Sequence, residues 1–200
     1  MKNRFYKVLV FRLTSFGVLL FFLFLGGSVI SASLVQVPFL SQVPPGNWLQ
    51  TRNCGPVSLL MIDAYLSGKV VDSNSINQIN DWMFQNMGRD KRDYNGDYTN
   101  VSDLKKLAIE YLLIFEENIE VKKGTGELDD LKSNLEVGNP LIVGTYTNMK
   151  LKDYDDDPTT NDVKHFMVLV GIDEEYVYVH DPGKTKGANN KYTIDQFKLA

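Results

Sequence analysis

The sequence predicts an α+β domain with a helical N-terminal part and an antiparallel sheet in its C-terminal part. Three observations lead to this prediction. Apolar residues recur at helical spacing between residues 55 and 137, runs rich in valine, isoleucine and tyrosine follow from residue 140 onward, and a turn at Asp173–Glu174 joins two of these runs. Helices followed by strands are typical of α+β proteins, in which strands that are neighbours in the chain pair antiparallel.

The first predicted helix covers residues 55–67 and starts directly after Cys54. Pro56 suits the first helical turn, and Gly68 suits the position just past the end. The apolar residues of this helix fall at the i, i+3, i+4, i+7 and i+8 positions of one face: Val57, Leu60, Met61, Ala64 and Tyr65. The helix therefore places Cys54 at its N-terminus.

Further helices and strands follow from the same two periodicities. Three more helices are expected, over Ser75–Met87, from the Asn100 cap to Leu112, and over Leu128–Leu135. Strands are expected at residues 118–122, 140–147, 165–172 and 176–181, and residues 34–42 form a short extended segment.

The first 33 residues have the composition of a secretory signal peptide or an N-terminal membrane anchor. Four basic residues precede an apolar run at Phe16–Leu25, and small residues follow at Ser31–Ser33. The absence of a cysteine near the predicted cleavage region excludes a lipid anchor there. We therefore expect an extracytoplasmic protein, secreted or attached to the membrane by an uncleaved signal, whose domain covers residues 34–200.

The rest of the chain is acidic, with 17 basic and 25 acidic residues after those four are removed. This balance argues against a nucleic-acid partner. The aspartates of Lys150–Asp162 do not have the spacing of an EF-hand, and we expect a solvated loop there rather than a calcium site. One cysteine and two histidines do not predict a zinc site, so no metal and no cofactor is expected.

Cys54 is the only cysteine of the chain, and an exported domain with one cysteine cannot form an internal disulfide. At a helix N-terminus the unpaired backbone N–H groups and the helix dipole stabilise a thiolate, which is the nucleophilic form of cysteine. A buried, inert thiol is the alternative, and the position alone does not separate the two.

The two histidines lie on neighbouring predicted strands. The predicted turn places His165 opposite Asp181 or Pro182. Pairing with Asp181 puts both side chains on one face, while His180 points to the other. A histidine takes the thiol proton and later protonates the leaving group, and a carboxylate orients its ring. The pattern thus predicts a catalytic triad of Cys54, His165 and Asp181.

Two stretches resemble a known family. SQVPPGNWLQTRNCGPVSLLM resembles the start of the C39-like cysteine peptidases, and HFMVLVGIDEEYVYVHDP resembles their closing hairpin. The resemblance runs from about Val37 to the C-terminus. It implies a papain-like fold, in which a helical lobe carries the nucleophile and a sheet carries the histidine and the aspartate. The family also uses an upstream glutamine that donates to the oxyanion together with the backbone N–H of Cys54. Gln42 fits this role by motif, and Gln50, nearer to the cysteine, is the alternative.

We therefore expect an exported cysteine peptidase that cleaves a peptide or amide bond of a peptide or protein substrate, acts as a monomer and needs no cofactor. Acyl transfer from the same acyl-enzyme is one alternative, and a non-catalytic cell-surface module that binds peptides is another. The intact Cys-His-Asp set argues against a pure binder. Gly55, directly after the nucleophile, is expected to leave room for substrate.

Overall fold

The computed structural model describes residues 6–11, 34–42, 52–88, 99–124, 128–146 and 164–199. The helical elements are α1 (Cys54–Ser67), α2 (Ser73–Met87), α3 (Val101–Lys106), the π-helical turn η2 (Leu107–Tyr111), the 3-10 turn η3 (Glu116–Asn118), α4 (Leu128–Glu136) and α5 (Ile194–Leu199). The strands are β1 (Tyr6–Phe11), β2 (Ile119–Gly124), β3 (Leu141–Tyr146), β4 (Lys164–Ile172), β5 (Tyr176–His180) and β6 (Asn190–Thr193).

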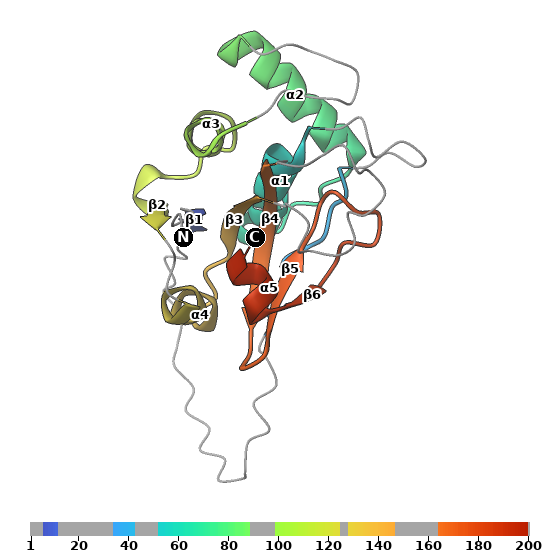
Figure 1. The fold of residues 1–200 in the computed structure, drawn as a ribbon. Coiled ribbons are helices and arrows are strands. Elements are labelled where there is room, and N and C mark those ends of the chain that lie inside the picture. Colours follow the sequence, from blue (N-terminus) through green and yellow to red (C-terminus); the bar gives the residue numbers. More distant parts are fainter. Residues whose placement is uncertain are drawn as a thin grey trace.

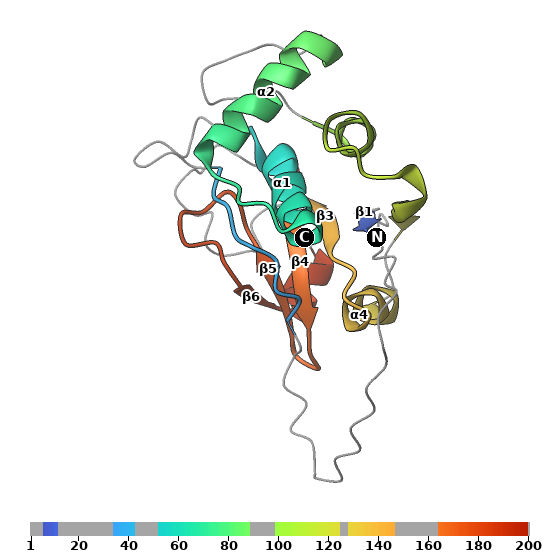
Figure 2. The same ribbon diagram turned by 180° about the vertical axis from the view of Figure 1, so that it is seen from behind.

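The strands form one antiparallel sheet in the order β2-β1-β3-β4-β5-β6. Helix α1 packs against β4 on one face of this sheet, α5 lies on the other face, and α2 lies beyond α1 (Figures 1 and 2). This architecture confirms the predicted α+β fold with an antiparallel sheet. The order of helices and strands is less strict than expected, because β1 and β2 join the sheet from the N-terminal part of the chain.

Strand β1 lies within the segment whose composition predicts a signal peptide or anchor. Tyr6–Phe11 pairs with β2 on one side and with β3 on the other. The rest of the first 33 residues lies outside the described residues, so the export of the chain stays a prediction. Over the part of the chain that the structure describes, no helix is both long and apolar enough to cross a membrane.

Helix α1 is buried on nearly all sides rather than along one stripe. Leu59 and Ile62, which lie off the predicted apolar face, are as fully buried as Val57 on that face. A helix that is apolar all round belongs in a core, and α1 fills the space between β4 and α2. The helix ends at Gly68, whose φ of 72° is the left-handed conformation that glycine adopts without strain.

The start of α1 is therefore fixed by core packing at one end of the sheet. Asn53 occupies the N-cap position but makes no side-chain cap hydrogen bond, so a side-chain cap does not define this helix start. In contrast, Asn100 caps α3 as predicted, by accepting from the backbone N–H groups of Ser102 and Asp103.

Candidate active site

Cys54 is the first residue of α1 and is half-buried. Burial raises the pKa of its thiol, but the hydrogen bond and charge of His165 and the backbone N–H groups of Phe166 and Gly55 outweigh burial, and the net pKa lies below the ordinary value. The helix N-terminus contributes in the same direction. Cys54 is thus set up as a thiolate rather than as an inert buried thiol.

Gly55 serves packing, not substrate access. A Cβ at this position would lie 2.3 Å from Thr99 Oγ1 and 3.2 Å from a ring carbon of Phe166. The absence of a side chain lets the first turn of α1 lie directly against β4, which brings Cys54 to the strand that carries His165. The expectation that Gly55 leaves room for substrate was therefore wrong in its physical reason.

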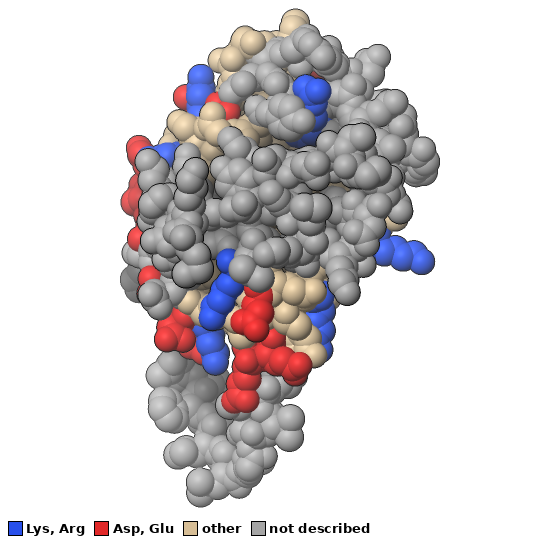
Figure 3. Space-filling view, viewed as in Figure 1, with Lys and Arg blue, Asp and Glu red and all other residues tan. Residues whose placement is uncertain are grey.

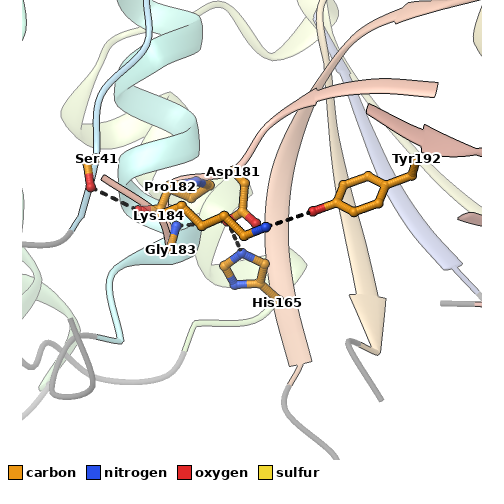
Figure 4. Close-up of polar contacts among 7 residues, drawn as sticks. All are labelled: Ser41, His165, Asp181, Pro182, Gly183, Lys184 and Tyr192. Carbon is orange, nitrogen blue, oxygen red and sulfur yellow. Dashed lines mark hydrogen bonds and ion pairs between the residues drawn. The ribbon is translucent and has the colours of Figure 1, made fainter. Parts of the chain in front are cut away.

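His165 lies on β4, and its side chain is buried between Cys54 and Asp181. Its Nε2 is 2.7 Å from Asp181 Oδ1 (Figure 4), and the ring also forms a side-chain hydrogen bond with Cys54. Since Nε2 faces Asp181, Nδ1 is the ring nitrogen left for the thiol.

Burial of His165 lowers its pKa, but the charge and hydrogen bond of Asp181, with those of Cys54, raise it to about 10. The pair is therefore a thiolate and an imidazolium at neutral pH.

The hairpin that joins β4 to β5 does not have the predicted register. Next to the turn, Ile172 pairs with Val177, but further along the hairpin Val168 pairs with His180. Between these two pairs β4 contains one more residue than β5. The extra residue is a β-bulge at Val170.

This bulge decides which face Asp181 shares with His165. Extending the observed pairing beyond β5 puts His165 opposite Gly183, two residues from the predicted partner, so the predicted register was wrong. Side chains alternate along a strand, and Asp181 therefore lies on the same face as Gly183 and reaches His165 diagonally. Without the bulge His165 would face Lys184, and Asp181 would point to the other side of the sheet.

Asp181 is fully buried and tightly held. Its Oδ1 also accepts from the backbone N–H of Gly183 at 2.9 Å, and its own backbone N–H donates to the carbonyl of Gly187 at 2.8 Å. A Cβ at Gly187 would come within 1.8 Å of the Asp181 carbonyl oxygen, so this turn accepts only glycine without moving. Lys184 passes beside this group to reach the Tyr192 hydroxyl at 3.3 Å (Figure 4).

Gln42 lies at the end of the extended segment and reaches the same turn. Its backbone N–H donates to the Pro182 carbonyl at 2.8 Å, and the hydroxyl of Ser41 donates to the same oxygen at 3.4 Å (Figure 4). The Gln42 side chain is buried. The alternative oxyanion donor, Gln50, lies outside the described residues.

Several polar groups of the site could not be found from sequence patterns. The carbonyl of Pro182 and the N–H groups of Phe166 and Gly183 act through the backbone, which is the same for every residue type. Thr99 left no signal either, because it belongs to no motif. Its Oγ1 is buried beside Gly55 with no hydrogen-bond partner among the described residues.

No cofactor or metal geometry is found at this site. Among the described residues, no group of three or more His, Cys, Asp or Glu side chains is placed to hold a metal ion. The acidic loop Lys150–Asp162 lies outside the described residues, apart from any test of the calcium alternative. On the face in Figure 3, acidic side chains gather over the lower end of the β4–β5 hairpin beside basic ones, without a continuous basic stripe over the described residues.

With this geometry in place, comparison with known proteins gives the family. Residues 35–200 match the Peptidase C39 like family, and the chain belongs to that family. A crystal structure from Bacillus anthracis, assigned as a C39-like peptidase, is similar in fold. It shares 23% identity at a TM-score of 0.51, with 85% of this chain and 92% of that chain covered, and this likeness concerns the fold alone. No curated protein matches the sequence.

Proposed function

We propose that this member of the C39-like family is an exported cysteine peptidase that hydrolyses a peptide or amide bond through Cys54, His165 and Asp181. The observation that carries the proposal is the continuous contact from the Cys54 thiol through the His165 ring to Asp181 Oδ1. Nucleophile, base and orienting carboxylate within hydrogen-bond reach of one another are the signature of nucleophilic catalysis at a carbonyl.

The first half of the reaction uses the charged pair. The Cys54 thiolate attacks the carbonyl carbon, an S–C bond forms, and the carbonyl electron pair moves onto oxygen. Gln42 and the backbone N–H of Cys54 donate to that oxyanion, whose charge develops only in the transition state. His165 gives its proton to the leaving amine as the C–N bond breaks, which leaves a thioester on Cys54.

The second half restores the enzyme. Neutral His165 takes a proton from water, the resulting hydroxide attacks the thioester carbon, and the C–S bond breaks with the thiolate as the leaving group. Asp181 stays ionised throughout and stabilises the imidazolium, because a fully buried carboxylate beside a charged ring has no reason to take the proton. An amine in place of water would give acyl transfer from the same thioester.

Export rests on the composition of the first 33 residues, with their basic start, apolar run and small residues. The substrate is then a peptide or protein outside the cytoplasm, and the acidic balance of the chain favours no nucleic-acid partner.

The direct test is digestion of a peptide library by the purified protein, with Cys54→Ala as the matched control. We expect cleavage that the control lacks, and a transient thioester on Cys54 by mass spectrometry. Equal cleavage by both proteins contradicts the proposal. Amide products formed with an added amine, in place of acids, identify acyl transfer. Rapid and His165-dependent labelling of Cys54 without any turnover identifies a binding module.

A further inference from the structure

The segment that carries Gln42 crosses the sheet without being a strand of it. Only three backbone groups of residues 34–42 bond to the rest of the fold by the bonds described so far and by one more. The Val35 N–H donates to the carbonyl of Val170 at 2.8 Å, and the Gln42 N–H donates to Pro182. Between these points the segment needs another contact to fix its path.

His180 supplies that contact. Its Nε2 is 2.7 Å from the carbonyl oxygen of Val37, and its Nδ1 accepts from the backbone N–H of Asn189 at 3.1 Å. A neutral imidazole has one donor and one acceptor nitrogen. Because the amide of Asn189 needs an acceptor, Nε2 carries the hydrogen and donates to Val37.

The surroundings of His180 hold the ring in this orientation. Its side chain is 4% exposed, and the edge of Phe39 meets it with ring centroids 5.7 Å apart at 82°. A Cβ at Gly187 would lie 3.2 Å from Phe39, so Phe39 packs between His180 and the turn that follows Asp181. Asn189 has a φ of 52°, a conformation that asparagine tolerates better than most residues, and presents its N–H to the ring.

We propose that His180 is a positioning residue that fixes Gln42 for oxyanion binding by holding the Val37 carbonyl and Phe39. The inference rests on the proposed function, in which Gln42 is the oxyanion donor. Three consecutive residues then organise both halves of the site. The side chain of His180 holds the donor segment, the side chain of Asp181 holds His165 on the opposite face, and the carbonyl of Pro182 holds the Gln42 backbone.

Two reactions of Cys54 separate this role from a general effect on the fold. Hydrolysis of an amide or ester passes through an oxyanion and requires a placed donor. Alkylation by iodoacetamide forms an S–C bond at a saturated carbon as iodide leaves, with no oxyanion at the reacting carbon. Loosening the segment 34–42 should therefore slow hydrolysis and leave alkylation unchanged.

A matched pair of polar variants in the full-length protein tests the proposal. In His180→Gln the amide nitrogen reaches the place of Nε2 and can donate to Val37, whereas the shorter His180→Asn reaches only the place of Nδ1. We expect His180→Asn to lower kcat/KM for a peptide or ester substrate by at least about tenfold, a part of the 10²-fold or larger effect of losing an oxyanion donor. His180→Gln should recover most of this loss, and iodoacetamide should alkylate Cys54 at the wild-type rate in both.

Combination with Gln42→Ala completes the test. If His180 acts through Gln42, the double variant His180→Asn, Gln42→Ala hydrolyses no more slowly than Gln42→Ala alone. Additive losses, equal losses in His180→Gln and His180→Asn, or a parallel loss of alkylation each overturn the proposal.

Amide hydrogen exchange provides a readout that does not need a substrate. His180→Asn should speed exchange at Val35 and Gln42 while exchange within α1 stays at the wild-type rate, and unchanged exchange at Gln42 overturns the proposed hold. If wild-type protein hydrolyses nothing although iodoacetamide labels Cys54 rapidly, the proposed function fails. The exchange result then decides the positioning role separately.

Discussion

His165 and His180 are both almost wholly buried, with 5% and 4% of their surfaces exposed, yet their pKa values move in opposite directions. Burial lowers the pKa of each. At His165 the carboxylate of Asp181 and the thiol of Cys54 reverse the effect and raise the pKa to about 10. At His180 burial prevails over the weaker effect of the Val37 and Val179 carbonyls, and the pKa falls below its ordinary value.

The difference shows that the partner, and not the degree of burial, decides the charge of a buried histidine here. A full negative charge compensates for desolvation, whereas a carbonyl dipole does not. The neutral ring can then accept from the Asn189 amide, which an imidazolium cannot do. The charged ring suits proton transfer to a leaving group, and the neutral ring suits holding a backbone segment in place.

The largest expected effect comes from removing the charged histidine. We expect His165→Ala to lower kcat/KM by roughly 10³-fold or more, as for the loss of a triad member, far beyond the effect of His180→Asn. Loss of His165 also lets the pKa of Cys54 rise, so that alkylation at pH 6.5 slows. Comparable losses in the two histidine variants would break the distinction between them.

Asp181→Asn tests the cause of the raised pKa. The amide keeps the shape but removes the charge, so the pKa of His165 should fall from about 10, and the alkaline limb of the pH–rate profile should move to lower pH. We expect a loss of kcat/KM on the order of 10²- to 10⁴-fold, because the wrong tautomer is no longer excluded. An alkaline limb that stays in place would assign the shift to some group other than Asp181.

Gly187→Ala perturbs the turn on which both histidines depend. The added Cβ would lie 1.8 Å from the Asp181 carbonyl, so backbone must move, at a cost of about 1–3 kcal/mol in the free energy of unfolding. Gly68→Ala is the matched control, since it faces open space and adds only the strain of a positive φ. Denaturant unfolding measures both, and an equal loss in the two variants would contradict the close packing of the turn.

The pH dependence of stability should show the two histidines as opposite slopes, each at most about 1.4 kcal/mol per pH unit. His165 binds its proton more tightly when folded, so its contribution is complete below an unfolded pKa of about 6.5 and is lost as pH rises toward 10. His180 binds its proton less tightly when folded, so its contribution is complete above about 6.5 and is lost as pH falls.

The measurement is denaturant unfolding between pH 5 and 10 in a Cys54→Ala background, where no thiol titrates. His180→Gln should flatten the acid side of the curve and His165→Gln the alkaline side. If either substitution flattens the opposite side, the assignment of the two slopes is wrong.

The sequence was sufficient for the fold class, for the helix start at Cys54 and for the proximity of His165 and Asp181. Each follows from a local pattern: helical periodicity, a cap position, and strands that alternate. The register was wrong because a bulge changes the count by one without a residue type that requires it. Gly171 was the available signal, since a glycine inside a strand often accompanies a bulge, and a Cβ there would lie 2.3 Å from Leu34.

Other features depend on contacts between distant parts of the chain. The reason for Gly55 appears only once Thr99 and Phe166 lie against it. Strand β6 is four residues long and contains Asn, Lys and Thr, so it has no period of its own to detect. The role of His180 depends on the carbonyl of Val37, and no pattern of side chains encodes a backbone acceptor.

Strand β1 makes two demands on the same six residues. A signal peptide keeps its basic start on the cytoplasmic side while the following domain crosses the membrane. Tyr6–Phe11 belongs to that basic start, and it also completes the sheet between β2 and β3. Translocation would put these residues and the peptidase domain in different compartments, so that β2 and β3 would lose their shared neighbour and have to pair anew. Tyr6–Phe11 is thus either part of an address or part of a fold, and the exported enzyme and its cytoplasmic precursor would differ in the middle of their sheet.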